Sequence, residues 1–343
     1  MEIQMNDLQV CIFCTQHVPW PWFRQTESGE GICNGVRFLL NEDPGEKAEW
    51  LVVFDSPARE TVTRIPRHRR ILVITEPPEV KPYPPRYLRQ FGVILTPFLL
   101  PGRDKNTLRI EGACLNWHYG VGTASGGGET TLDSLKSVQT MPVPPKRKLL
   151  SVICSTKTYT QAQRARIALV EQLMRHFGPA VDLFGRGRNP IDDKADAIAD
   201  YKYHIVLENN RIANFWTEKL SDAWIGYSLP LYAGAPNITG VIPDAAGLVE
   251  LPIDNHNACI KLIEDLLEKD PYQERFQAIA RCREWCLEST NVFARVAQVI
   301  READDRSKNA QMLTESFIIK DADRLETAVM RRLYRYNILR SPG

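Results

Sequence analysis

The sequence lacks any run of eighteen or more apolar residues, so we expect no transmembrane helix. Its first ten residues include Glu2 and Asp7 and lack the basic start and apolar core of a signal peptide. Net charge is also nearly absent, because 43 Lys and Arg residues offset 42 Asp and Glu residues. The net charge therefore gives no overall electrostatic attraction to nucleic acid. We expect a cytoplasmic protein that binds no nucleic acid.

The eight cysteine residues lack the spacing of a zinc site. Cys11 and Cys14 have CxxC spacing, but they lie in a predicted β-strand and no second CxxC pair follows. Cys282 and Cys286 are four residues apart on a predicted helix, a spacing that a packed helix face also produces. A structural zinc ion needs four closely placed ligands. We expect buried free thiols, and a metal or redox site is the alternative.

Short apolar runs alternate with loops and helical segments in the first half of the chain, which is typical of an α/β fold. Their continuous hydrophobicity predicts buried parallel strands. The predicted strands are Leu8–Cys14, Trp50–Asp55, Arg70–Thr75 and Phe91–Thr96. Helical segments fit at Gly35–Asn41 and Pro84–Gln90.

The second half repeats this alternation after Met141–Lys148, a proline-rich basic segment that is typical of an extended linker. The predicted strands are Leu149–Cys154, Val181–Phe184, Tyr203–Glu208, Leu229–Tyr232 and Leu248–Leu251. The predicted helices are Gln161–Phe177, Thr217–Tyr227, Asn257–Lys269 and Tyr272–Cys286. We predict two Rossmann-like α/β domains facing a cleft, residues 1–147 for the acceptor side and 148–305 for nucleotide binding, and a C-terminal helical tail over 306–343.

The segment Tyr201–Pro236 combines the features of a site for a nucleoside diphosphate. A predicted strand ends at Glu208–Asn209, and a helix begins after Thr217, a favourable N-cap residue. The N-terminus of a helix offers N–H groups and the positive end of its dipole to phosphate, and Lys219 adds a full charge. Glu218 can accept hydrogen bonds from ribose hydroxyls. A capped surface helix with an exposed Glu–Lys pair is the alternative.

In the order of its identities this segment resembles the donor-binding signature of the α-1,3-fucosyltransferases, glycosyltransferase family ten. The shared elements are Tyr-Lys-aromatic, a strand ending in Glu-Asn, an aromatic before Thr-Glu-Lys, and a Gly-x-Pro turn. The resemblance extends to Cys154–Leu173 and Val181–Gly185, and it covers roughly residues 149–300. It implies a GT-B-like fold and an inverting transferase that moves L-fucose from GDP-fucose onto a hydroxyl of a glycan or lipid-linked saccharide.

The resemblance also implies roles for single residues of the donor site. Arg166 and Lys219 would contact the diphosphate, and Glu218 would hold the ribose. Asn209 and Phe215 would line the nucleoside pocket. Many relatives have Tyr where this chain has Phe215, so one hydroxyl contact is missing.

Five further residues belong to the predicted donor site or compete for a place in it. Arg164 lies on the same helix start as Arg166 and can substitute for it. Gly185 and Gly187 flank a turn where the backbone can approach a base or a phosphate. The neighbouring Arg186 and Arg188 either contact the ligand or are solvated.

Transfer also needs a base for the acceptor hydroxyl. Glu76 ends a predicted strand before a diproline turn and resembles the family's strand-end Glu segment, so we predict Glu76 as this base. Glu79 is its rival and Asp55 a lesser candidate, while a solvated surface turn is the alternative. No Asp-x-Asp ends a strand in the donor half. We therefore predict a metal-independent enzyme with no cofactor besides its GDP-sugar donor.

The acceptor residues are predicted from aromatic rings, which stack on sugars. Trp20, Trp117 and His118 are the candidates, with packed loops as the alternative, and His204 is expected in the core. The segment Ala322–Arg340 can form a basic amphipathic helix at the inner face of a membrane. A tail packed across the domains or on a partner chain is the alternative.

The expected setting is bacterial polysaccharide or lipopolysaccharide biosynthesis. Two alternative functions stay open. The same scaffold could use another nucleotide sugar, or the chain could be a non-catalytic protein that binds a nucleotide or saccharide.

Overall fold

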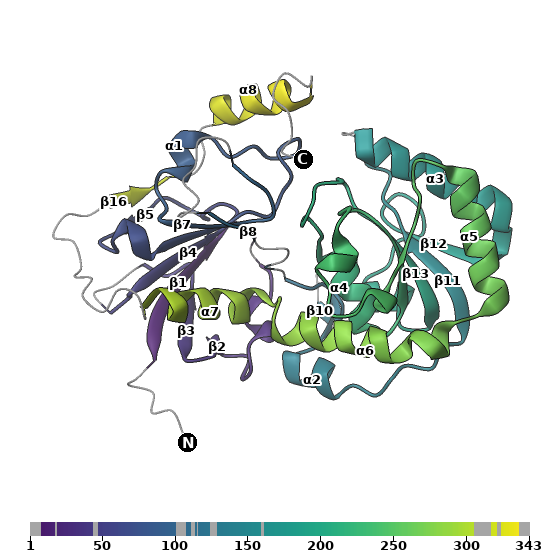
Figure 1. The fold of residues 1–343 in the computed structure, drawn as a ribbon. Helices are drawn as coiled ribbons and strands as arrows, with labels where there is room; N and C mark the ends of the chain where they lie inside the picture. Colours follow the sequence, from purple (N-terminus) through teal and green to yellow (C-terminus); the bar gives the residue numbers. More distant parts are fainter. Residues whose placement is uncertain are drawn as a thin grey trace. The chain divides into compact units, whose positions relative to one another are not determined.

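The computed structural model describes residues 8–17, 19–43, 47–100, 108–110, 114, 116–123, 129–158, 161–304, 317–320 and 324–335. The chain forms two compact units (Figure 1). Unit 1 contains Met1–Cys114 and Val292–Gly343, and unit 2 contains Leu115–Asn291. Among the helices of these described ranges, none combines the length and hydrophobicity that crossing a membrane requires.

Unit 1 is built on a seven-stranded sheet of order β2-β3-β1-β4-β6-β7-β8. Its strands are β1 (Gln9–Thr15), β2 (Ile32–Cys33), β3 (Val36–Leu40), β4 (Trp50–Phe54), β6 (Arg70–Val73), β7 (Val93–Thr96) and β8 (Leu108–Ile110). All neighbours pair in parallel except β2 and β3. Every residue of β4 and β6 is buried, as expected where both faces of a parallel sheet are covered. The four strands predicted in this half are confirmed.

The segment Gly35–Asn41, predicted as helical, is instead the strand β3, which pairs with β1. The prediction was wrong because the stretch Val36–Leu40, with four apolar residues and Arg37, is too short to show a helical period. Asn34 and Asn41 both have positive φ, 49° and 52°, so the backbone turns at each end of the strand. The helix predicted at Pro84–Gln90 is present as α1 (Pro85–Leu88).

The helix α7 (Val292–Asp304) packs against one face of this sheet. The buried cluster there includes Cys11 and Phe13 from β1 and Phe293 from α7. Because side chains alternate along a strand, Cys14 points to the opposite face from Cys11. The CxxC pair therefore does not converge. All eight cysteine residues are free and buried, as predicted.

Two further elements of unit 1 come from the C-terminal part of the chain. The strand β16 (Phe317–Ile319) pairs antiparallel with β5 (Thr61–Thr63). The helix α8 (Arg324–Arg335) lies within the predicted amphipathic segment. The end of that segment, including Leu339 and Arg340, lies outside the described residues, and its membrane contact stays a prediction.

Unit 2 is built on a five-stranded parallel sheet of order β12-β11-β13-β14-β15. Its strands are β11 (Lys148–Ile153), β12 (Val181–Phe184), β13 (Tyr201–Leu207), β14 (Leu229–Ala233) and β15 (Val249–Glu250). Its α-helices are α2 (Leu135–Thr140), α3 (Gln161–Phe177), α4 (Glu218–Ile225), α5 (His256–Lys269) and α6 (Tyr272–Glu288). Figure 1 shows α3 and α5 on one side of the sheet and α4 and α6 on the other. The predicted class, two α/β domains with parallel sheets, is confirmed for each unit by itself.

The division between the units differs from the predicted boundary near residue 147. Residues 116–147 belong to unit 2, where Trp117 and Val138 are buried in one cluster with Ile198. The helix α7 belongs to unit 1, because Phe293 is part of the core beneath that unit's sheet. Both assignments depend on contacts between residues far apart in the sequence, which local periodicity does not reveal.

Candidate functional site

A cavity of about 130 Å³ lies at the topological switch point of the sheet in unit 2. The strand β11 comes first in the chain but lies inside the sheet, so the chain adds β12 on one side of it and β13 on the other. Ligands of open α/β sheets bind outside the carboxyl ends of the strands at such a point. The cavity is lined by Ile153, Ser155, Arg166, Lys194, Ile198, His204, Ile205, Val206, Leu207, Glu218, Lys219 and Asp222.

The helix α4 begins beside this cavity with the predicted N-cap residue. The hydroxyl of Thr217 accepts a hydrogen bond from the amide of Lys219 at 3.4 Å. The carboxylate of Glu208, fully buried at the end of β13, accepts hydrogen bonds from the amide of Thr217 at 2.8 Å and from its hydroxyl at 2.8 Å. The strand end thus fixes the start of the helix, and the capped-helix geometry is confirmed.

The ammonium of Lys219 lies between two carboxylates. It donates to Glu218 Oε1 at 3.2 Å and lies 3.5 Å from Glu208 Oε2. Burial raises the pKa of Glu208 above its ordinary value, against the opposing charge of Lys219. Burial alone would lower the pKa of Lys219, but the two carboxylates raise it, so Lys219 keeps its charge.

Lys194 is a third cation of the cavity, and its role was not predicted from the sequence. Its ammonium donates to Asp222 Oδ2 at 2.7 Å and to Glu218 Oε1 at 3.3 Å. Burial alone would raise the pKa of Glu218, but Lys219 and Lys194 hold it well below its usual range. Glu218 is therefore an ionised carboxylate that forms ion pairs with both Lys194 and Lys219. Lys194 follows Asp193, the N-cap residue of the 3-10 helix η5 (Lys194–Ala197), and no sequence pattern marked it.

The buried carboxylate of Asp222 connects this network to His118. Its Oδ1 accepts hydrogen bonds from the amides of His118 at 2.7 Å and Tyr119 at 3.0 Å. Burial and the charge of Lys194 lower the pKa of His118 to about 4, so its imidazole is neutral at pH 7. His118 was predicted in the acceptor domain. The structure corrects this, because His118 belongs to unit 2 and lies beside the charges of the cavity.

Arg166 lines the cavity from the first half of α3. Its Nη2 donates to Ser155 Oγ at 3.1 Å, while its buried Nε has no hydrogen-bond partner among the described residues. The rival Arg164 is exposed and donates to the carbonyl of Thr158 at 2.9 Å. The structure therefore places Arg166, and not Arg164, in the cavity wall.

Gly185 and Gly187 have backbone conformations that suit glycine, with φ of 133° and 82°. A Cβ atom on Gly185 would lie 2.6 Å from the carbonyl oxygen of Cys154. One on Gly187 would lie 2.7 Å from Thr156 Oγ1. Both glycines let the loop after β12 pack against the loop after β11. The predicted ligand contact of Gly185 is not needed to explain its conformation and stays a prediction.

Asn209 and Phe215 have different surroundings at the end of β13. Asn209 is half-buried, and its Oδ1 accepts a hydrogen bond from Asn210 Nδ2 at 3.1 Å. Phe215 is only 2% exposed, and neither residue lines the cavity. The prediction that Phe215 contacts a nucleoside directly is not supported by this buried position. Asn209 remains a candidate at the strand end.

The Gly-Ala-Pro turn after β14 packs directly over Glu208. A Cβ atom on Gly234 would lie 2.2 Å from the hydroxyl oxygen of Tyr232 and 2.6 Å from Glu208 Cγ. The same hydroxyl accepts a hydrogen bond from the amide of Ala235 at 2.8 Å. The turn thus requires glycine because it closes onto the carboxylate that supports the cap of α4.

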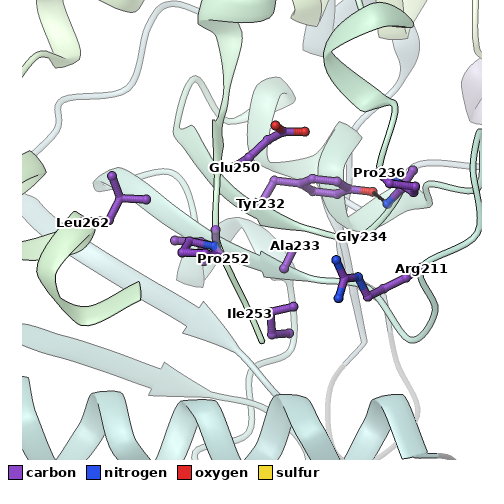
Figure 2. Close-up of a pocket in the computed structure, with 11 residues that line it drawn as sticks. Arg211, Tyr232, Ala233, Gly234, Pro236, Glu250, Pro252, Ile253 and Leu262 are labelled. Carbon is purple, nitrogen blue, oxygen red and sulfur yellow. Dashed lines mark hydrogen bonds between the residues drawn. The ribbon is translucent and has the colours of Figure 1, made fainter. Parts of the chain in front are cut away.

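A larger cavity of about 500 Å³ opens at the carboxyl ends of β14 and β15. In Figure 2 the ring of Tyr232 reaches toward Pro236, Leu262 and Pro252 form an apolar side, and Arg211 lies at the opposite end. None of the residues predicted to bind the donor or the acceptor lines this cavity.

The two aromatic candidates for the acceptor are not equivalent in the structure. Trp117 is 1% exposed in the cluster beneath α2 and α4, so it offers no face to a sugar, and that prediction is corrected. Trp20 is half-buried and packs against the core of unit 1. His204, expected in the core, is 3% exposed, and its Nδ1 lies 2.8 Å from Ser151 Oγ.

The predicted bases lie in unit 1 after β6. Glu76 and Glu79 are both half-buried and flank the buried prolines Pro77 and Pro78. Asp55 directly follows β4 and is 2% exposed. Three carboxylates thus follow two neighbouring strands of this sheet, at the edge where its strands end.

Residues 143–311 match the family model of the glycosyltransferase family 10 (fucosyltransferase) C-terminal domain. The human α-(1,3)-fucosyltransferase 4 is 25% identical over 190 residues, 51% of this chain and 34% of the relative. A fucosyltransferase-like protein of Arabidopsis thaliana is 26% identical over 142 residues, 40% of this chain and 25% of the relative. The chain thus spans about a quarter to a third of the length of the curated relatives it matches. The predicted family resemblance is confirmed in the C-terminal region.

Solved structures with a similar fold include an α1,3-fucosyltransferase with GDP, at 16% identity and a TM-score of 0.49 over 85% of this chain and 94% of that one. An Anabaena protein in complex with UDP and glucose has 8% identity and a TM-score of 0.47 over 87% of this chain and 100% of that one.

Proposed function

We propose that this chain, whose residues 143–311 match the family model of the family 10 fucosyltransferase C-terminal domain, is a glycosyltransferase that moves L-fucose from GDP-fucose to a saccharide hydroxyl. The observation that supports this most is the charged cavity at the switch point of unit 2. Three cationic and two anionic side chains line it, beside the capped N-terminus of α4. This arrangement suits a ligand that carries both a diphosphate and a ribose.

The cationic side chains would stabilise the leaving group. When the bond between C1 of the sugar and the diphosphate oxygen breaks, its electron pair stays on the diphosphate. Lys219 and Arg166 would then face the developing charge, and Lys194 adds a third cation at the same cavity. Fixed charges inside a partly enclosed site are worth more than they are in water. These cations would meet the electrostatic need without a metal ion.

Glu218 would hold the ribose. Two lysines keep its carboxylate ionised and in one orientation, so its oxygens are ready to accept hydrogen bonds from neighbouring hydroxyls. Asn209, at the end of β13, would contribute to the nucleoside side of the site. The backbone amide of Lys219, at the start of α4, donates a hydrogen bond to the hydroxyl of Thr217, and this bond holds the helix end in place.

The acceptor half of the reaction would use unit 1. Glu76, or its rival Glu79, would take the proton from the acceptor hydroxyl. The hydroxyl oxygen then forms a bond to C1 on the face opposite the diphosphate, and the C1–diphosphate bond breaks in the same step. The product would have the inverted configuration at C1, and the acceptor would be a glycan or a lipid-linked saccharide.

The test is acceptor-dependent release of GDP from GDP-fucose, measured beside UDP-, CDP- and dTDP-sugars. We expect release only with GDP-fucose and an added saccharide, and a product with inverted C1 by NMR. Release from another nucleotide sugar alone would instead support a transferase of different donor specificity. Binding of GDP without any transfer would support a non-catalytic nucleotide-binding protein.

A further inference from the structure

His17 and Asp55 lie at the topological switch point of the sheet in unit 1. The strand β1 comes first in the chain, the chain then adds β3 on one side of it, and β4 follows on the other. The carboxyl ends of β1 and β4 are therefore the place where a sheet of this kind binds ligands. His17 comes two residues after β1 ends, and Asp55 directly follows β4.

The backbone of His17 is held on both sides. Its amide donates to Thr15 Oγ1 at 3.1 Å, and its carbonyl accepts a hydrogen bond from Trp22 Nε1 at 2.9 Å. The imidazole meets the ring of Phe54 edge-on, with 6.2 Å between the ring centroids. The side chain is nevertheless 49% exposed. An exposed histidine on a fixed backbone presents its ring to solvent in a defined orientation.

Asp55 lies behind this imidazole. Its Oδ2 is 3.7 Å from His17 Nε2, and the same oxygen accepts hydrogen bonds from Gln16 Nε2 and Lys81 Nζ, each at 2.9 Å. The hydroxyl of Tyr83 donates to Oδ1. Asp55 also has a positive φ of 67°, so the backbone turns at this residue directly after β4. A proton on Nε2 would face the carboxylate, which leaves the lone pair of Nδ1 for a ligand.

The charges of this cluster indicate what kind of ligand it suits. The ammonium of Lys81 is already paired with Asp55, and it also contacts Ser56 Oγ. Burial alone would raise the pKa of Asp55, but His17, Lys81 and Tyr83 hold it below its usual value, so the carboxylate is ionised. Because the ammonium of Lys81 is already paired with Asp55, it is not available to attract an anion. The cluster suits the hydroxyl groups of a neutral saccharide.

We propose that His17, positioned by Asp55, binds a hydroxyl group of the saccharide acceptor. This inference rests on the proposed function, and it assigns His17 to recognition and leaves proton removal to Glu76. The same cluster also holds the turn that carries Glu76. The amide of Thr75 donates to the Tyr83 hydroxyl at 3.4 Å, and Thr75 directly precedes Glu76. Asp55 thus supports both the residue that would bind the acceptor and the turn of the base.

The test is an NMR titration of the full chain with 15N-labelled histidine. The His17 signals are assigned by their loss in His17→Gln, and the probes are lactose, maltose and chitobiose, with inorganic phosphate as the anionic comparison. We expect at least one disaccharide to shift the His17 signals and phosphate to leave them unchanged. His17→Gln should then weaken binding of that disaccharide about tenfold, the effect of losing one hydrogen bond. His68→Gln, a change of an exposed histidine in the same unit, should leave it unchanged.

Two outcomes would overturn the inference. One is that no disaccharide moves the His17 signals or that only phosphate does. The other is that His17→Gln binds the disaccharide as tightly as the wild type. In transfer assays, His17→Gln should raise the acceptor KM and spare kcat, whereas a collapse of kcat at unchanged KM would make His17 the base. Asp55→Asn should weaken binding of the same disaccharide. The double variant with His17→Gln should lose little further affinity.

GDP binding is measured on the same samples, because it separates this inference from the proposed function. Wild-type protein that binds GDP but shows no disaccharide effect at His17 refutes the inference alone. Wild-type protein that fails to bind GDP refutes the proposed function.

Discussion

The carboxylate of Glu208 lies 3.5 Å from the ammonium of Lys219, and the same carboxylate accepts hydrogen bonds from the amide and hydroxyl of Thr217. One buried acid therefore fixes both the cap of α4 and the cation beside it. Glu208, at the end of β13, therefore contacts both the N-cap residue of α4, Thr217, and the charged side chain of Lys219. This explains physically why Glu-Asn, Thr-Glu-Lys and the Gly-x-Pro turn occur together in the sequence.

Lys219→Ala should weaken binding of GDP by roughly 10- to 100-fold, the effect of removing a charge-assisted hydrogen bond. Binding of inorganic pyrophosphate should fall in parallel, whereas guanosine should bind as before. Isothermal titration of the three ligands measures this. Lys261→Ala, which removes an exposed lysine from α5, is the matched control. Unchanged pyrophosphate affinity in Lys219→Ala would contradict the assignment of Lys219 to the diphosphate.

Gly234→Ala should destabilise the protein by about 1–3 kcal/mol, the usual cost of overpacking. The added methyl would collide with the hydroxyl of Tyr232 and with Glu208 Cγ. Gly240→Ala is the control, because a Cβ atom there meets nothing within 4 Å. Urea denaturation of both variants gives the comparison, and equal stability would show that the turn is not closed onto Glu208.

Glu76→Ala should lower kcat by roughly 10²- to 10⁴-fold, because a general base contributes about that much. GDP affinity should stay at the wild-type value, since Glu76 lies in unit 1 and the donor cavity in unit 2. Glu79→Ala is made in parallel. The assignment fails if Glu76→Ala transfers at the wild-type rate, and a selective loss in Glu79→Ala would move the role to that residue.

Acid should destabilise the protein partly through His204. Burial lowers the pKa of His204 to about 3, so the folded state stays unprotonated where the unfolded chain binds a proton. This contribution is fully present above pH about 6.5 and is lost as the pH falls toward 3. The free energy of unfolding should fall by up to about 1.4 kcal/mol per pH unit from this group.

His204→Gln should reduce that pH dependence by about one proton between pH about 6 and 5. Chemical denaturation at several pH values gives the slopes. An unchanged slope in His204→Gln would mean that the buried imidazole accepts its proton in the folded state.

The sequence predicted unit 2 well because its signals are local. Gln161–Phe177 has a helical period, and Val181–Phe184 is a short apolar run bounded by turns, and both were found with these bounds. Thr217 is a favourable N-cap residue, and its cap is present. Gly35–Asn41 was misassigned because strand and helix patterns cannot be distinguished over the four apolar residues of Val36–Leu40.

The remaining errors concern contacts between distant segments. Trp117 is an aromatic residue next to a histidine, a pattern that suits an acceptor loop, but its burial depends on residues about 80 positions later, such as Ile198. Lys194 was missed because its role comes from Asp222 and Glu218, which the fold brings to it. No spacing in the sequence carries that information.

The most direct test of the central claim, a diphosphate-and-ribose site at the switch point of unit 2, is titration of GDP into wild-type protein and into Glu218→Gln. The account predicts that the wild type binds GDP and that the affinity for GDP relative to pyrophosphate falls about tenfold in Glu218→Gln, because the ribose contact is weakened while both lysines remain. Failure of the wild type to bind GDP, UDP, CDP or dTDP, or an equal relative affinity in both proteins, would contradict it.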